Sequence, residues 1–228
     1  MKLLSLLLIG AGLLTPKSTL AQNHQYFPLV LDSVWEYSIT EGTSTVGITG
    51  TATINGLETY VRLSILTGPH AQTVINYWSL NEEGDVFLHG ASNADGFSVT
   101  YDPPILWLDP PLSVGQSWIV ETMADNQFLS FTTGIIWEGE VTVPAGLFHT
   151  YGRAILGGQV LLFADRYGSH DLLGFRVDPQ RQRDDVSEWY NNGTGMIKDQ
   201  YANHQLVDYM IPVGVEVSSW SELKALYR

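Results

Sequence analysis

Residues 141–156, VTVPAGLFHTYGRAIL, carry the strongest fold signal in this chain. Pro144 and Gly146 interrupt an apolar run, and apolar and aromatic residues resume from 147 to 156, which predicts a tight turn followed by a strand. An earlier stretch, NGLETYVRLSIL at 55–66, repeats this order with one position of slippage. The recurrence favours a chain built from two related β halves.

Two further pairs of segments support an internal duplication. PLSVGQSW at 111–118 matches PLVLDSVW at 28–35, and EWYNNGTGMI at 188–197 corresponds to 77–87. The alternative is that such pairs recur because the starts of strands reuse the same residues and the same turn chemistry.

The predicted halves cover residues 22–108 and 109–211 and form a mainly β, antiparallel sheet that curves into an open or half-closed barrel. Between them lies DPPILWLDPP at 102–111, whose four prolines argue against a central strand and favour an extended connection. The tail 212–228 contains a Ser and a Glu at capping-box spacing, which predicts a short C-terminal helix. We expect this helix to pack on the β body, with docking on a partner as the alternative.

Residues 1–21 have the features of a signal peptide. Lys2 precedes an apolar run at 3–14, and small residues allow cleavage near Ala21. The run is shorter than the about 20 residues that a membrane-spanning helix needs, so no transmembrane segment is predicted. We expect a secreted or periplasmic protein. Because the chain has no Cys, disulfides, thiolate catalysis and a lipid anchor on a Cys at the cleavage site are excluded.

The charge of the chain is strongly negative and unevenly distributed. The formal net charge is −13 at pH 7, which repels phosphate backbones, so nucleic acid is excluded as a partner. Between residues 22 and 152 the only Lys or Arg is Arg62.

If the duplication holds, the second half carries a polar insertion at 157–185. Its residues Asp165, His170 and Asp171 form a candidate polar cluster for acid/base chemistry or metal binding, and a solvated charged hairpin explains them equally. Glu138 and Glu140 would share one face of a strand, as paired carboxylates of a glycoside hydrolase do, or as solvated strand positions do.

Four motifs resemble a group of bacterial secreted proteins of unassigned chemistry. They are YFPL with Trp35 at 26–35, PLSVGQSW at 111–118, VPAGLF at 143–148 and WYNNGTGMIK at 189–198. Asp32 departs from the pattern, which has Gly there. These proteins look like distant relatives of periplasmic half-barrels of the lipoprotein-carrier type. The resemblance implies a curved antiparallel sheet that cradles an apolar ligand, and it carries over no catalytic residue.

No signature of an enzyme occurs in the sequence: there is no GxSxG, no HExxH and no phosphate-binding Gly-rich loop, and the six His residues lack ligand spacing. No cofactor and no metal site are predicted. The high aromatic content instead predicts a non-enzymatic binding or carrier protein for an apolar or amphiphilic ligand, such as a hydrophobic small molecule or lipid. We predict Trp107, Trp137 and Phe163 on the ligand face. The recurring tryptophans are assigned to the core: Trp35, Trp78, Trp118 and Trp189.

Two alternatives to a carrier remain. One is a structural or interaction module of the cell envelope, in which a sheet edge or the insertion at 157–185 meets an envelope protein. The other is a hydrolase that uses the polar cluster of the insertion.

Overall fold

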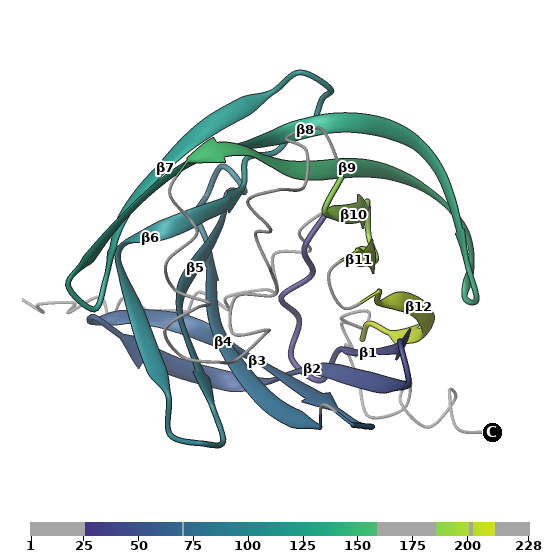
Figure 1. Ribbon diagram of the computed structural model, residues 1–228, viewed down its shortest axis with the longest axis horizontal. Helices are drawn as coiled ribbons and strands as arrows, with labels where there is room; N and C mark the ends of the chain where they lie inside the picture. Colours follow the sequence, from purple (N-terminus) through teal and green to yellow (C-terminus); the bar gives the residue numbers. More distant parts are fainter. Residues whose placement is uncertain (1–25, 70, 159–185, 201–202, 213–228) are drawn as a thin grey trace, which may run out of the picture.

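The computed structural model describes residues 26–69, 71–158, 186–200 and 203–212, and the rest of the chain lies outside the described residues. The described part consists of strands (Figure 1). In chain order they are β1 (Val34–Ile39), β2 (Gly42–Ile54), β3 (Leu57–Leu66), β4 (Gln72–Leu80), β5 (Val86–Asn93), β6 (Ser98–Leu108), β7 (Ser117–Ala124), β8 (Gln127–Val143), β9 (Gly146–Gly158), β10 (Glu188–Asn191), β11 (Gly195–Asp199) and β12 (Gln205–Met210).

The strands form a closed barrel in which each is antiparallel to its neighbours. Each strand pairs with the next along the chain, and β12 pairs with β1, where Val34 lies opposite Met210 and Trp35 opposite Tyr209. The mainly β, antiparallel prediction is confirmed, whereas the open or half-closed barrel is wrong. The strand β12 was not predicted from the sequence, and it provides the hydrogen-bonding partner that leaves β1 with no free edge.

Two long hairpins contain the turns from which the duplication was inferred. The pair Asn55 and Gly56 joins β2 to β3, with φ angles of 50° and 81°, a conformation that suits Gly and Asn in a two-residue turn. Gly146 follows the other turn, between β8 and β9, with φ 141°. Figure 1 shows β8 and β9 arching across one side of the barrel. The amide of Ala145 at their tip donates to the carbonyl oxygen of Leu206 at 2.9 Å, which ties this hairpin to β12.

The proline-rich stretch at 102–111 differs from the prediction, because its first part belongs to β6. Pro103 and Pro104 lie where the ladder to β5 is interrupted: Gly90 pairs with Thr100, and the next pair joins Leu88 to Ile105. At such a bulge no amide hydrogen is required, so proline is tolerated within a strand.

The barrel interior is packed with side chains from alternating strand positions. In β7 the residues Trp118, Val120, Thr122 and Ala124 are buried and their neighbours are exposed, as expected for a strand with one inward face. The segment 26–30, which precedes β1, is buried as well and runs through the interior (purple in Figure 1).

Three of the four tryptophans assigned to the core are buried: Trp35, Trp78 and Trp118 have exposed fractions of 5%, 3% and 8%. The assignment of Trp189 is wrong. Its strand neighbours Glu188 and Tyr190 point inward, so Trp189 points outward, where Lys198 Nζ lies 5.1 Å from its ring centroid.

Several predictions concern residues beyond the described ranges. The signal peptide at 1–21, nearly all of the insertion at 157–185 and the C-terminal helix lie outside the described residues. The division into halves at 22–108 and 109–211 stays a prediction.

Candidate functional site

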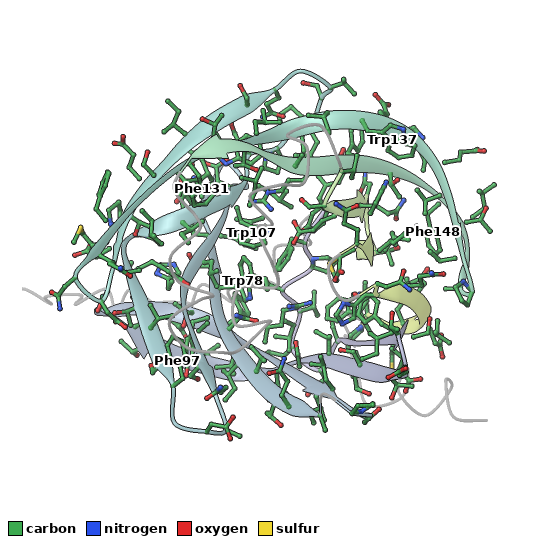
Figure 2. All side chains as sticks on the ribbon, viewed as in Figure 1. Trp78, Phe97, Trp107, Phe131, Trp137 and Phe148 are labelled. Carbon is green, nitrogen blue, oxygen red and sulfur yellow. The ribbon has the colours of Figure 1, made fainter. Side chains whose placement is uncertain are left out.

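A cavity of about 80 Å³ lies inside the barrel, and the strands β2, β3, β4, β6, β10 and β11 contribute to its wall. Part of the wall is apolar, with Val46, Leu66 and Val74 from three successive strands. Trp78 and Trp107 project into the barrel (Figure 2), and their rings meet edge to face with centroids 5.3 Å apart. A cavity of this volume is large enough to hold several water molecules.

The wall formed by β2, β3 and β4 is polar as well as apolar. Arg62 on β3 lies directly opposite Asn76 on β4, and Ser64 is two positions from Arg62 on the same inward face. The positive charge of Arg62 acts on the phenol of Tyr37, whose hydroxyl donates to the carbonyl oxygen of Met196 at 3.0 Å, and the guanidinium carbon of Arg62 lies 6.0 Å from the centroid of the Phe27 ring. Burial raises the pKa of Tyr37 far above its usual value, so this phenol stays protonated.

Two buried polar atoms belong to residues that line this wall. Ser44 and Trp78 have exposed fractions of 1% and 3%. Among the described residues, neither the hydroxyl of Ser44 nor Nε1 of Trp78 has a hydrogen-bond partner. Buried polar groups are nearly always hydrogen-bonded, so both atoms are candidates for contact with a ligand.

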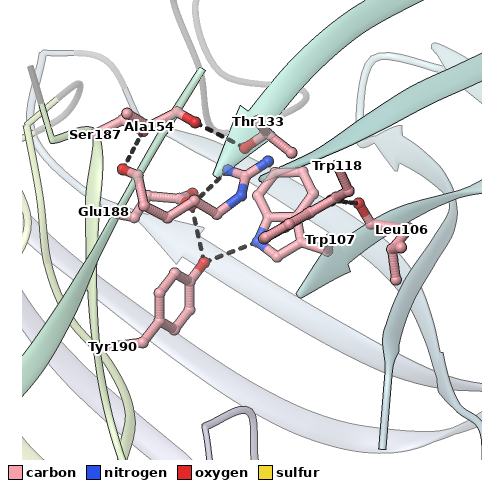
Figure 3. A network of polar contacts seen from close by, with 9 residues as sticks. Leu106, Trp107, Trp118, Thr133, Ala154, Ser187, Glu188 and Tyr190 are labelled. Atoms are coloured by element: carbon pink, nitrogen blue, oxygen red, sulfur yellow. Dashed lines mark hydrogen bonds and ion pairs between the residues drawn. The ribbon is translucent and has the colours of Figure 1, made fainter. Parts of the chain in front are cut away.

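A buried network of polar contacts forms another part of the wall (Figure 3). Arg153 on β9 donates from Nη1 to Oε2 of Glu188 at 2.8 Å, and the hydroxyl of Tyr190 donates to the same oxygen at 3.0 Å. Nε1 of Trp107 donates in turn to the Tyr190 hydroxyl at 2.8 Å. The Arg153 guanidinium carbon lies 4.2 Å from the Trp107 ring centroid, which adds a cation–π contact.

The pKa of Glu188 is raised above its ordinary value because the carboxyl group is completely buried. Arg153 and Tyr190 favour the ionised form and oppose this effect, whereas the nearby Asp199 adds to it. Asp199 lies directly opposite Glu188 in the β10–β11 pair. Its Oδ2 is 2.5 Å from Nδ1 of His204, and the His204 ring meets the ring of Tyr37 edge to face at 5.4 Å.

The residues predicted on the ligand face lie in different places. Trp107 lines the cavity. Trp137 does not: it is half-buried on β8, where its ring covers Gly139, since a Cβ atom on that glycine would lie 2.7 Å from Cζ2 of Trp137. Phe163, like the polar cluster Asp165, His170 and Asp171, lies outside the described residues.

The carboxylates suggested for glycoside hydrolysis lie on the outer face of β8. Glu138 and Glu140 are both exposed, and Oε1 of Glu138 is 3.1 Å from Nε2 of His149 on the neighbouring strand. The two buried carboxylates that line the cavity, Glu188 and Asp199, were not singled out from the sequence.

A signal for the polar interior was present in the sequence. Arg62 and Arg153 occupy corresponding places in the two similar stretches, each within a run of apolar residues. An isolated Arg in a buried strand requires a partner, and this criterion would have indicated both positions.

Metal ligands do not cluster in the described part of the chain: no three His, Asp or Glu residues there could hold a metal ion. The described residues also contain no helix long and apolar enough to cross a membrane.

The chain has little similarity to known proteins. No protein-family model matches the chain, and no curated protein matches it. Among solved structures, the chain is similar to a crystal structure of a protein from Parabacteroides distasonis that is provisionally described as a lipoprotein, with 12% sequence identity and a TM-score of 0.37. The alignment covers 82% of this chain and 99% of that one. At this TM-score the similarity carries no argument about fold or function.

Proposed function

We propose that this chain is a secreted or periplasmic binding protein that carries a small amphiphilic ligand in the cavity of its barrel, without catalysing a reaction. The observation that carries the proposal is the composition of the cavity wall. Val46, Leu66, Val74 and the two tryptophans provide an apolar surface, and buried polar side chains lie beside them on the same strands. Ligand pockets typically combine a mostly apolar lining with a few placed polar groups.

The charged residues of the wall are arranged for binding more readily than for catalysis. Glu188 accepts hydrogen bonds from Arg153 and Tyr190, and Asp199 is hydrogen-bonded to His204. A general acid or base has to transfer a proton to a substrate, and Glu188, whose Oε2 already accepts from Arg153 and Tyr190, is better suited to fixing the shape of the wall.

Native mass spectrometry of the full chain, exported and processed by its own host and purified without detergent, tests the proposal. We expect a reproducible additional mass, and solvent extraction should identify it as an amphiphile. Titration of the delipidated protein with a C10 alkyl alcohol should then change the tryptophan emission, because Trp78 and Trp107 line the cavity. A clean polypeptide mass together with unchanged emission would contradict the carrier function.

An interaction module is a second candidate, and a different surface favours it. Closure of the barrel removes the free sheet edge, but the outer face of β7 and β8 exposes Ile119, Met123 and Phe128 by 68%, 41% and 57%. Met123 and Phe128 lie opposite each other in the ladder. If this face binds an envelope protein, Phe128→Glu should abolish co-purification of that protein and leave ligand binding unchanged.

A further inference from the structure

Resting on the proposed function, we propose that the cavity recognises the carboxylate head group of its ligand, and that Arg62 is the residue that binds it. Arg62 is the only Lys or Arg between residues 22 and 152, and β3 directs it into the barrel of an acidic protein. The ion pairs between described residues are His149–Glu138, Arg153–Glu188 and His204–Asp199, so none of them includes Arg62.

The two inward-facing arginines therefore differ in their surroundings. Arg153 has a carboxylate oxygen at 2.8 Å, whereas the described contacts of Arg62 are the phenol of Tyr37 and the ring of Phe27. A guanidinium stays charged at any physiological pH, and Arg62 is half-buried in the cavity wall beside apolar side chains, where an anionic partner would stabilise its charge. An anionic group of the ligand would supply such a partner.

Other side chains of the cavity wall also offer hydrogen-bond donors, which a ligand group with acceptor oxygens would satisfy. The indole Nε1 of Trp78 can only donate a hydrogen bond, and it has no partner among the described residues. The amide of Asn76 lies directly across the β3–β4 ladder from Arg62, whereas the Ser44 hydroxyl lies further along the wall, opposite Leu66. The neighbouring strands β3 and β4 thus present hydrogen-bond donors to one part of the cavity. A ligand group with several acceptor oxygens matches them.

A carboxylate fits this cavity better than a phosphate does. The planar guanidinium forms two parallel hydrogen bonds with the two oxygens of a carboxylate. The wall also contains Asp199 and Glu188, and a phosphate monoester that carries close to two negative charges would be repelled by them more strongly than a singly charged carboxylate. The head group would lie beside Arg62, and the alkyl chain would extend along Val46, Leu66 and Val74 of the same wall.

The test compares three ligands of equal chain length, decanoate, decanol and decyl phosphate, by calorimetric titration of the delipidated full chain. For the wild type we expect decanoate to bind about 10- to 100-fold more tightly than decanol, the range expected for hydrogen bonds to a charged group. Arg62→Met should abolish this preference while decanol affinity stays within about 2-fold, as expected if the apolar wall is intact. Lys198→Met is the matched control, since it removes one positive charge from the outer face, and it should retain the preference.

The outcomes separate the head-group assignment from the carrier function. If decanol and decanoate bind the wild type equally, or if Arg62→Met keeps the preference for decanoate, Arg62 is not the binding residue although the cavity binds amphiphiles. Tighter binding of decyl phosphate would overturn the choice of carboxylate. Binding of none of the three would refute the carrier function itself. Should Arg62→Met fail to fold, Arg62→Lys keeps the charge and loses the bidentate geometry, and its preference should fall between the wild type and none.

Discussion

The buried pair Arg153–Glu188 gives the sharpest quantitative prediction for stability. Their side chains are 0% and 5% exposed and 2.8 Å apart. Glu188→Leu removes the carboxylate from a guanidinium that cannot lose its proton, and we expect a loss of about 3–5 kcal/mol in the free energy of unfolding. For a domain of this size, that loss corresponds to a Tm lower by about 6 to 20 °C, at about 2–4 °C per kcal/mol.

Arg153→Met should cost less than Glu188→Leu at low pH, because Glu188 can neutralise itself by taking up a proton. The pKa of Glu188 is already raised by burial, so between its ordinary value and the folded value the native state holds a proton that the unfolded state has lost. The free energy of unfolding therefore falls as the pH rises through this window. Without Arg153 the pKa rises further, so the deficit of Arg153→Met should shrink as the pH is lowered toward about 4.5.

Urea unfolding of both single variants and the double variant, followed by near-UV circular dichroism from pH 4.5 to 8, measures these effects. The double variant should be more stable than the sum of the single losses predicts, because two apolar side chains can replace a buried pair at little cost. Glu138→Gln, at the exposed pair with His149, should change stability by less than about 0.5 kcal/mol. Strictly additive losses in the double variant would show that the two residues are not coupled, and the reasoning would be wrong.

Three further predictions concern other parts of the barrel. Ser44→Ala and Ser33→Ala each remove a buried hydroxyl with no described partner, so both should lower the free energy of unfolding by less than about 1 kcal/mol or increase it. Only Ser44→Ala should weaken ligand binding, measured by titration. Weaker ligand binding in both variants would argue against a contact at Ser44. Gly90→Ala should destabilise the barrel by about 1–3 kcal/mol in thermal unfolding, because its Cβ atom would lie 2.6 Å from the carbonyl oxygen of Val99. Trp137→Phe should leave the ligand-induced change in tryptophan emission intact, whereas Trp78→Phe should reduce it.

Strands with clear alternation or turn chemistry could be predicted from the sequence. The strand predicted at 147–156 lies within β9, and the similar stretch at 55–66 contains the Asn-Gly turn and the strand β3. Such signals are local, and a hairpin needs only neighbouring residues to form. The segment 205–210, QLVDYM, has no comparable pattern, since its apolar residues are adjacent and do not alternate with polar ones. Its strand conformation follows from pairing with β1, which no local signal reveals.

The apolar part of the cavity was easier to anticipate than its polar part. Trp107 was predicted on the ligand face and lines the cavity. Glu188 and Asp199 could not be brought together from the sequence alone, because the pairing that sets them opposite each other depends on the register of β10 and β11. The neighbouring ladders also explain why Trp189, aligned with Trp78 in the sequence, points outward: Tyr190 lies opposite Tyr151 as Trp78 lies opposite Tyr60, so the true correspondence is offset by one residue.

The β1–β12 pairing has a consequence for how the chain reaches its folded state after synthesis. The β1–β12 ladder pairs Ser38 with Gln205, which are 167 positions apart, and this pairing closes the barrel. Because contacts so distant in the chain form slowly, closure of the barrel should be a slow, late step of folding. Until then β1 and β11 each present an unpaired edge, so the incompletely synthesised chain should be the form most prone to aggregation.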